Sequence, residues 1–373
     1  MDRFIFVDKP TLIIDPIRAK KNIAMMARKA AGQNIRFRPH FKTHQSGEIG
    51  EWFAEEGVQQ ITVSSVTMAE YFADLGWQDI LIAFPANIRQ IEAIYNLARK
   101  IERLGLLVES VESLEFLGRR VPSPVEIWIK VDTGNYRTGI SWDQLTEFEG
   151  ILQAIKKFPQ FNLRGILTHA GNTYQAASKD EITQIYQLSV TRMQAVRNQL
   201  ARFWDKPLEI SVGDTPGCSI CADLGAVDEI RPGNFVFYDA EQLALGTCTA
   251  DQIAVAVACP VVALHPQRNE VIIYGGAIHL SKDFYEKDGI RIYGLPALPG
   301  SNGWEEPLKG GYVSGLSQEH GVVHLEDEDL NKISIGDLLF IIPAHSCLTV
   351  QALPQYFSTD GEIITTLLTS ANE

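Results

Sequence analysis

Residues 125–139 read Val-Glu-Ile-Trp-Ile-Lys-Val-Asp-Thr-Gly-Asn-Tyr-Arg-Thr-Gly, and this stretch decides the expected fold. An apolar run of strand length stops at Asp132, and a polar stretch with two glycines follows it at once. A short apolar run bounded by turn residues is typical of a strand that is buried on both faces, as in a parallel sheet. The same pattern of strand and polar loop recurs on both sides of this stretch.

Eight such runs lie between residues 10 and 245, and segments with helical periodicity separate them. Asp15, Thr67 and Ser178 are the expected N-caps of three of these helices. Eight strands that alternate with helices predict an α/β protein with a (β/α)₈ barrel of the TIM type. An open, doubly wound sheet is the alternative. The expected strands are 36–39, 61–64, 80–84, 105–109, 125–132, 163–169, 208–213 and 226–231.

The sequence changes character after residue 245, where helical periodicity fades and glycine and proline punctuate short β-rich segments. We therefore expect a barrel over residues 10–245 and a C-terminal all-β domain over residues 246–373. Residues 1–9 are expected to join the β domain through a strand at 3–7. The other expected strands of this domain are 253–263, 270–274, 321–325 and 337–342.

Composition excludes several classes of function. The formal net charge is −13 and no basic block is present, so nucleic acid is not an expected partner. The longest apolar runs are far shorter than a membrane span, and the N-terminus does not resemble a signal peptide. A cytoplasmic protein without membrane contact is the expectation. Five cysteines, an odd number, argue against a disulfide framework.

Polar clusters follow five of the expected strands, at 38–44, 132–139, 168–174, 211–217 and 231–234. In barrels of this type, the chemistry takes place at the C-terminal ends of the strands, so five clusters on one rim predict a site there. Glycines and small hydroxyl residues in the last two clusters offer backbone N–H groups to a phosphate. Lys42 is an amine suited to Schiff-base chemistry, although an exposed lysine in a basic loop is the alternative.

Together these segments resemble the alanine-racemase-type (fold type III) barrel class of pyridoxal 5′-phosphate (PLP) enzymes. They look most like its D-serine dehydratase and D-threonine aldolase branch. Residues 38–44, Arg-Pro-His-Phe-Lys-Thr-His, are similar to the branch motif whose lysine carries the cofactor. Residues 132–139 resemble its D-x-G-x-x-R-x-G motif, and residues 169–174 resemble its H-x-G-x-x-Y motif. The resemblance covers nearly the whole chain, and the motifs occur in order.

The resemblance implies a set of cofactor contacts. Lys42 would carry PLP, Arg137 would bond its phenolic oxygen and His169 would lie against its ring. The partner of the pyridine nitrogen is open between Tyr174 and Arg231. The remaining implied cofactor-binding residues are His40, Ser211, Gly213, Asp214, Thr215, Gly233, Asn234 and Tyr238.

In the second domain, residues 317–321 and 343–347 resemble two further motifs of the branch. In an extended segment, residues i and i+2 face the same way, so His345 and Cys347 could grip one ion. Imidazole and thiolate together suit Zn²⁺. The same pair is a metal site in the dehydratases of this branch. The resemblance therefore implies a divalent metal, expected to be Zn²⁺, and a catalytic role for His345 and Cys347.

The implied activity is that of a PLP-dependent lyase acting on a small D-amino acid. In a D-serine dehydratase-like elimination, Lys42 would remove the α-proton while the metal polarises the β-hydroxyl group. D-threonine aldolase-like cleavage of a β-hydroxy-D-amino acid is the alternative, and Cys347 favours the dehydratase because aldolases of the branch tend to have an oxygen ligand there. A non-catalytic PLP-binding protein and a sugar-phosphate barrel enzyme without PLP are further alternatives. The resemblance also implies a homodimer with a shared active site.

Three features depart from the dehydratase pattern. Arg231 before Pro-Gly is similar to the racemases, in which an arginine bonds the pyridine nitrogen. Ile278 stands where dehydratases commonly have lysine, and this leaves His279 as either a substrate contact or a strand-edge histidine. No counterpart of the racemase tyrosine motif is found in the second domain, which argues against simple alanine racemisation.

Overall fold

The structure, a computed structural model, describes residues 4–370 of the chain. Within this range the chain forms two compact units. The barrel unit comprises residues 25–42 and 50–233, and the β unit comprises residues 4–24, 43–49 and 234–370. Residues 10–24 and 234–245 thus belong to the β unit, whereas the expected barrel included them. The reason at the N-terminal side is that a strand at residues 11–14 pairs within the sheet of the β unit.

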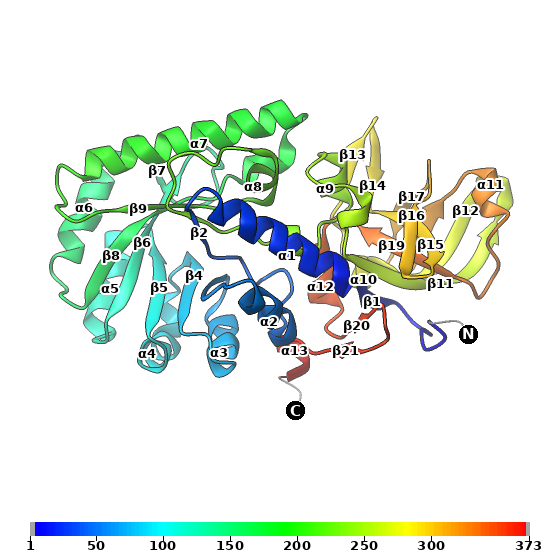
Figure 1. Cartoon of the computed structure of the whole chain (residues 1–373), viewed down its shortest axis with the longest axis horizontal. Coiled ribbons are helices and arrows are strands. Elements are labelled where there is room, and N and C mark those ends of the chain that lie inside the picture. The colour runs from blue at the N-terminus through cyan, green and yellow to red at the C-terminus, as the bar shows by residue number, and fades with distance from the viewer. Residues whose placement is uncertain (1–3, 371–373) are drawn as a thin grey trace. The chain divides into compact units, whose positions relative to one another are not determined.

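The barrel unit contains a parallel sheet whose strand order is β2-β10-β9-β8-β6-β5-β4-β3 (Figure 1). All eight strands predicted from the sequence are therefore confirmed, with ends shifted by a few residues. Their bounds are β2 (Arg36–Phe37), β3 (Gln60–Val63), β4 (Asp79–Pro85), β5 (Arg103–Val108), β6 (Val125–Asp132), β8 (Phe161–Leu167), β9 (Glu209–Val212) and β10 (Glu229–Ile230), while β7 (Ile140–Ser141) pairs with β6 off this path.

The two ends of this strand order meet just beyond β2. His40 forms a parallel bridge with Thr62 of β3. The backbone N–H of Phe41 donates to the Thr62 carbonyl at 2.8 Å, and the Thr62 N–H donates to the Pro39 carbonyl at 2.9 Å. The sheet is thus a nearly closed barrel, as predicted, and not the open sheet of the alternative.

Helices alternate with the barrel strands, and local side chains define where they begin. The Asp15 carboxylate accepts from the Arg18 N–H at 3.0 Å, and Ser178 accepts from the Glu181 N–H at 3.2 Å, so both expected caps are confirmed. The expected cap at Thr67 is wrong, because Ser65 accepts from the Met68 N–H at 3.1 Å instead. The helices are α1 (Pro16–Ala31), α2 (Gly47–Glu55), α3 (Val66–Asp74), α4 (Ile91–Lys100), α5 (Val111–Arg120), α6 (Leu145–Ile155), α7 (Lys179–Leu200), α8 (Thr215–Ile220), α9 (Ala240–Ala244), α10 (Ala277–Leu280), α11 (Asp327–Leu330), α12 (Ser346–Ala352) and α13 (Leu367–Ser370).

Side chains fill the interior of the barrel. Leu81, Leu107, Trp128 and Leu167, from four different strands, form an apolar cluster that solvent does not reach. At Gly165 on β8, an added Cβ would lie 2.2 Å from the carbonyl oxygen of Glu209 on β9, so the close pairing of these strands requires glycine. Because the interior is packed, the rim is where the barrel can bind a ligand.

The β unit contains a sheet of order β16-β15-β19-β11-β1-β20-β21, and β12, β17 and β18 extend it from β11. Four predicted strands are confirmed as β11, β12, β18 and β19. The expected strand at 3–7 is wrong for the described residues, since residues 4–6 form a turn and residue 3 lies outside the described range. The bounds are β1 (Thr11–Ile14), β11 (Val255–His265), β12 (Glu270–Tyr274), β13 (Tyr285–Lys287), β14 (Ile290–Ile292), β15 (Gly294–Gly300), β16 (Gly303–Pro307), β17 (Tyr312–Leu316), β18 (His320–His324), β19 (Leu338–Pro343), β20 (Tyr356–Ser358) and β21 (Ile363–Ile364).

The N-terminal strand of this sheet is β1, because its four residues, three of them apolar, are all buried and lie between two partner strands. It pairs antiparallel with β11 and parallel with β20. Ile5, in the turn that precedes it, is 84% exposed and has no such partner strand. All five cysteines lie within the described residues, and none of them forms a disulfide there. In the part of the chain that the structure describes, no helix has the length and apolar character needed to cross a bilayer.

Candidate active site

Lys42 lies at the rim of the barrel unit, two residues after the bridge that closes the barrel. The neighbouring Phe41 is fully buried, and its ring centroid is 5.0 Å from that of Phe53 and 4.9 Å from that of Phe72. The Lys42 side chain is exposed, and its backbone N–H donates to His40 Nδ1 at 3.3 Å. The buried phenylalanine thus anchors the loop that carries the exposed lysine at the rim.

His169, after β8, is held as a neutral imidazole. Its Nδ1 is hydrogen-bonded to the Gly213 carbonyl, which must accept, so the proton is on Nδ1. Burial lowers the pKa of His169 well below its usual value, and the cations of Lys42 and Arg137 lower it further. A neutral, oriented ring of this kind can pack against a planar cofactor without repelling the cation of a nearby lysine.

Arg231, after β10, is a buried cation on the floor of the rim. Its Nε donates to Ser211 Oγ at 2.7 Å, and Nη2 donates to the Thr168 carbonyl. Burial lowers the pKa of Arg231 to about 10, against an opposing effect of the Glu229 carboxylate, so the guanidinium is still charged at neutral pH. It can donate a charge-assisted hydrogen bond to a ring nitrogen or another acceptor.

The loop after β9 lies close against the segment after β10. An added Cβ at Gly213 would lie 2.9 Å from Arg231 Cβ, so only glycine fits where the two loops approach each other. The Thr215 backbone N–H donates to the Tyr174 hydroxyl at 3.4 Å, which places Tyr174 beside this loop. The structure thus brings Tyr174 together with the expected phosphate-binding residues.

Asp214 is the capping residue of this loop. Its Oδ1 accepts from the Gly217 N–H at 2.5 Å and from Thr173 Oγ1 at 3.0 Å. Its Oδ2 is buried and has no hydrogen-bond partner within the described residues. Burial raises the pKa of Asp214 to about 6, because the hydrogen bonds from Gly217 and Thr173 only partly compensate the cost of burying the charge. Asp214 is therefore a structural cap with a titratable, unsatisfied oxygen.

Arg137 belongs to a loop that Asp132 organises. Asp132 Oδ1 accepts from the backbone N–H groups of Gly134 and Asn135, both at 2.9 Å. The Arg137 side chain is exposed, and it lies close enough to His169 to lower the pKa of that imidazole. The expected cofactor-binding residues of the barrel unit therefore lie on one rim. Gly233 is the last residue of this unit.

The sequence analysis missed Lys130, which lies on β6 and is 5% exposed. Burial lowers the pKa of Lys130 to about 7, and the neighbouring Arg231 and Arg137 cations contribute. Its Nζ donates to the Val131 carbonyl at 3.3 Å. The available signal was that Lys130 is two residues from Trp128 in a strand, because alternation turns every second side chain to the same face.

Asn234 and Tyr238 belong to the β unit, unlike the other expected cofactor residues. The Asn234 side-chain amide donates to Asp239 Oδ2 at 2.5 Å and to Ser346 Oγ at 2.9 Å, so the structure shows it tying two segments of the β unit together. Tyr238 is buried and has a left-handed backbone with φ of 52°. The segment 234–239 is therefore a compact turn beside His345.

His345 and Cys347 lie at the start of α12 and not in an extended segment, so the expected i, i+2 strand geometry is wrong. His345 is the N-cap residue, and Cys347 belongs to the first turn. The two side chains nevertheless meet, since the imidazole and the thiol are within hydrogen-bonding reach. Cys347 Sγ is also 3.3 Å from the hydroxyl of Thr43.

Two carboxylates lie near one nitrogen of the His345 ring. Glu241 Oε2 is 3.5 Å and Asp239 Oδ2 is 3.6 Å from His345 Nδ1. Burial lowers the pKa of His345, but the thiol and the two carboxylates raise it by more, so that the pKa lies well above its usual value. Between residues 4 and 370, no three His, Cys, Asp or Glu side chains converge as a complete metal site.

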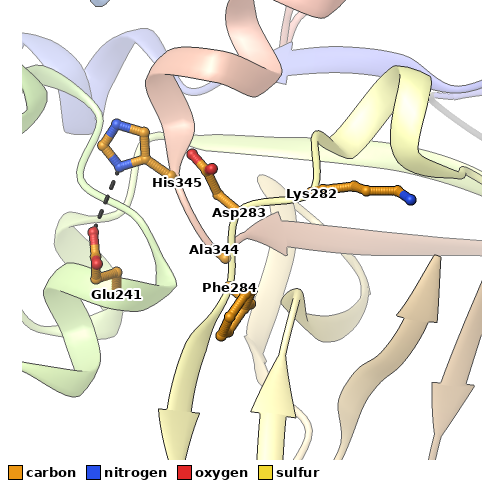
Figure 2. A pocket seen from close by; sticks show the side chains of 6 residues that line it. All are labelled: Glu241, Lys282, Asp283, Phe284, Ala344 and His345. Carbon is orange, nitrogen blue, oxygen red and sulfur yellow. Dashed lines mark ion pairs between the residues drawn. The ribbon is translucent and has the colours of Figure 1, made fainter.

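A cavity of about 310 Å³ adjoins His345 (Figure 2). Glu241, Asp283 and Phe284 line it, and Figure 2 shows Lys282 directed away from His345. His279 is nearby in sequence but lies on α10, where its Nδ1 accepts from the Gly276 N–H at 3.3 Å. His279 therefore caps a short helix and is not a strand-edge residue. The adjacent Ile278 is 48% exposed.

The residues present fit both implied groups. The exposed amine suits the aldehyde of PLP, and the neutral imidazole suits its ring. The buried guanidinium suits the pyridine nitrogen, and the glycine-containing loop suits the phosphate. A thiol and an imidazole that meet, with room beside them, match a divalent metal with two protein ligands and open positions for other ligands.

The whole chain is similar to known proteins. Residues 14–241 match the family model described as "Alanine racemase, N-terminal domain", and residues 254–359 match the one described as "Putative serine dehydratase domain". A D-threo-3-hydroxyaspartate dehydratase of Delftia sp. (strain HT23) is 28% identical, with 98% of each chain covered. A D-serine dehydratase of Dictyostelium discoideum is 27% identical, with 95% of this chain and 94% of that one covered.

Among solved structures, a D-threo-3-hydroxyaspartate dehydratase mutant with a cysteine replaced by alanine, in the metal-free form, has a TM-score of 0.90. It is 26% identical, with 98% of this chain and 99% of that chain covered. The first family model spans more than half of the chain and the second follows it directly. The chain therefore belongs to the PLP-dependent alanine-racemase-type (fold type III) family, in the group with a serine dehydratase domain.

Proposed function

We propose that this protein is a PLP- and Zn²⁺-dependent lyase that eliminates water from a small β-hydroxy-D-amino acid, with D-serine as the first candidate. The observation that carries the proposal is the meeting of the His345 imidazole and the Cys347 thiol in the domain that matches the serine dehydratases. A plain racemase reaction has no use for such a pair, whereas loss of a hydroxyl group needs a Lewis acid or a proton donor.

PLP, when bound, supplies the electron sink that makes the α-proton of an amino acid acidic. Lys42 would hold it, and the same amine, once released, would accept the α-proton at Nζ. His169 would pack against the ring, and the backbone of Gly213 and Thr215 would bind the phosphate. The pyridine nitrogen would accept from Arg231 or from Tyr174, because the Tyr174 hydroxyl, which accepts from the Thr215 N–H, keeps its own O–H to donate.

Zn²⁺, when bound, supplies Lewis acidity at the β-hydroxyl group. Cys347 would hold it through the thiolate and His345 through one ring nitrogen. Thr43, whose hydroxyl is 3.3 Å from Cys347 Sγ, directly follows Lys42 in the chain. One peptide bond therefore links the lysine that would handle the α-proton to a residue in contact with the cysteine of the metal pair.

The first test is incubation of the protein, loaded with PLP and Zn²⁺, with D-serine, and measurement of pyruvate. Pyruvate from D-serine, none from L-serine and loss of the reaction on chelation would support the proposal. Turnover of D-threo-3-hydroxyaspartate alone would retain the lyase chemistry and change the substrate. Release of glycine from D-threonine without pyruvate from D-serine would favour aldol cleavage, and no turnover of any of the three would contradict a lyase.

The cofactor assignment has a separate test. Lys42→Ala should lose the visible absorbance of the PLP-loaded protein and the label trapped by borohydride, because no amine is left at that position. Lys206→Ala, an exposed lysine of the same unit, is the matched control and should retain both. A trapped cofactor in Lys42→Ala would overturn the assignment of Lys42.

We also propose that the protein forms a homodimer that shares its active sites, on the strength of the family resemblance. Light scattering coupled to size-exclusion chromatography would measure the mass. A strictly monomeric, active protein would contradict this part of the proposal.

A further inference from the structure

The His345 ring is held from one side by two carboxylates that belong to one short segment. Figure 2 shows Glu241 directed at the lower nitrogen of the ring, with a dashed line for the contact. This nitrogen is Nδ1, which lies 3.5 Å from Glu241 Oε2 and 3.6 Å from Asp239 Oδ2. The two acidic residues are two positions apart in the chain and converge on the same ring atom.

Asp239 is a rigid support in this arrangement. It is fully buried and caps α9, where its Oδ1 accepts from the Gln242 N–H at 3.0 Å. Its Oδ2 accepts from the Ser346 N–H at 2.9 Å and from the Asn234 amide at 2.5 Å. Because these donors already satisfy its lone pairs, Asp239 has little capacity left to hold the imidazole by itself.

Glu241 is the carboxylate with free capacity. It belongs to the first turn of α9, and its backbone N–H donates to the Ala344 carbonyl at 3.1 Å. That bond ties α9 to the residue that precedes His345, so the glutamate side chain is anchored close to the imidazole. The Glu241 side chain is 24% exposed and lines the cavity beside His345.

A neutral imidazole has one N–H, and the nitrogen that faces a carboxylate carries it. The other nitrogen then presents its lone pair, and a carboxylate on the N–H side orients a metal-binding histidine and strengthens its basicity. We propose that Glu241, supported by Asp239, is the positioning residue that places the proton on His345 Nδ1 and leaves Nε2 for the metal. This inference rests on the proposed function, because it concerns the same metal pair.

A second arrangement of the same residues would make Glu241 a metal ligand. Within residues 4–370, no three His, Cys, Asp or Glu side chains converge on one point, which argues against a direct bond. The two roles differ in what they do to a bound metal. A positioning residue changes affinity and leaves the ligand set of the saturated site intact, whereas loss of a ligand changes the ligand set itself.

The test is a metal titration of Glu241→Gln, measured on PLP-loaded protein from which metal has been stripped by a chelator. We expect the Kd for Zn²⁺, measured by competition with a chelating dye, to rise by about 10- to 100-fold. Glu286→Gln is the matched control, since Glu286 is an exposed residue of the same unit that pairs with Arg291, and its Kd should stay within about twofold of the wild type. An unchanged Kd in Glu241→Gln would overturn the inference.

Saturation with Co²⁺ separates positioning from ligation. The thiolate-to-Co²⁺ charge-transfer band and the ligand-field bands of Glu241→Gln should match those of the wild type once the site is full. Altered bands at saturation would make Glu241 a ligand and overturn the inference. Asp239→Asn, which keeps a capping side chain, provides a second variant and should also raise the Kd. Equal thermal midpoints of the metal-free variants and wild type would confirm that the loss of affinity does not come from unfolding.

His345→Ala distinguishes the failure of this inference from the failure of the proposed function. If the wild type binds Zn²⁺ no more tightly than His345→Ala, the metal pair itself is wrong and both proposals fall. If the wild type binds tightly, His345→Ala does not, and Glu241→Gln behaves as the wild type does, only the positioning role falls.

Discussion

At the scale of single residues, several cationic side chains lie on the rim of the barrel. Burial lowers the pKa of Lys130, and the nearby Arg231 and Arg137 cations lower it further. His169 stays neutral for the same reasons. A site with this balance favours an anionic ligand such as a phosphate ester.

Asp214 is a buried acidic residue on this rim, and its titration predicts a dependence of stability on pH. The folded pKa of about 6 lies above the ordinary value of an aspartate, so the folded protein binds a proton more tightly than the unfolded chain does. The stabilising, protonated form is fully present below about pH 4, and stability falls as the pH rises to about 6. The size of the loss is about 2–3 kcal/mol.

Asp214→Asn keeps a good helix cap and removes the titration. The free energy of unfolding, measured with urea between about pH 4 and pH 6.5, should fall less with rising pH in this variant than in the wild type. Asp205→Asn, at an exposed position of the same unit, is the control and should follow the wild type. Parallel pH profiles for the wild type and Asp214→Asn would contradict the prediction.

At the scale of secondary structure elements, the contact between β8 and β9 depends on a single glycine. An added Cβ at Gly165 would lie 2.2 Å from the Glu209 carbonyl oxygen and 2.8 Å from its backbone nitrogen. Neither backbone atom can move without breaking the parallel register of Gly165 with Glu209. The two strands lead to His169 and Ser211, so this register also positions the rim.

Gly165→Ala should therefore lower the free energy of unfolding by about 1–3 kcal/mol or more, as overpacking typically does. Gly315 on β17 is the matched control, because an added Cβ there has no neighbour within 4 Å. Gly315→Ala should be neutral or stabilising by up to about 1 kcal/mol, since alanine restricts the unfolded chain. Urea unfolding of both variants measures the difference, and equal effects would refute the packing argument.

At the scale of the whole molecule, the residues proposed to hold PLP and those proposed to hold the metal belong to different compact units. Lys42 belongs to the barrel unit, and His345 and Cys347 belong to the β unit. Each unit has its own sheet and its own buried core. Loss of one group is therefore not expected to release the other.

Chelation should separate the two groups in solution. Treatment with EDTA is expected to abolish lyase activity while the visible absorbance of bound PLP is retained, because the chelator removes only the metal of the β unit. Added Zn²⁺ should restore activity, and Mg²⁺ should restore less, since a thiolate ligand suits the softer ion. Loss of the absorbance together with the metal would show that the two groups do not bind independently.

The barrel could be predicted because its signal is local. A run such as Val125–Asp132 predicts both a strand and the residue at which the strand ends, and eight such runs in order predict the barrel. The sequence analysis missed Lys130 because a buried lysine and an exposed lysine are the same residue type and differ only in the face of the strand on which they lie. The sequence analysis missed the strand at Thr11–Ile14 because its three consecutive apolar residues have no period that distinguishes a strand from the start of a helix.

The metal pair illustrates the same limit. His-x-Cys predicted that two ligands would meet, but an extended segment and the first turn of a helix both bring such residues near each other. The helical start at His345 is decided by tertiary bonds, since the Ser346 N–H donates to Asp239, which is 107 positions away. The role of Glu241 has no local signal at all, for it comes from the contact of two segments that are far apart in sequence.

The sequence by itself determined the alternation of strands and helices, the order of the rim motifs and the side chains that we propose as holders of PLP and a metal. Those are properties of neighbouring residues, governed by periodicity and by the chemistry of each side chain. Only the tertiary structure decided where the units divide, which carboxylates face His345 and which charges are buried. These depend on burial and on contacts between distant segments, which set the local dielectric and hence the pKa values and the orientation of the ligands.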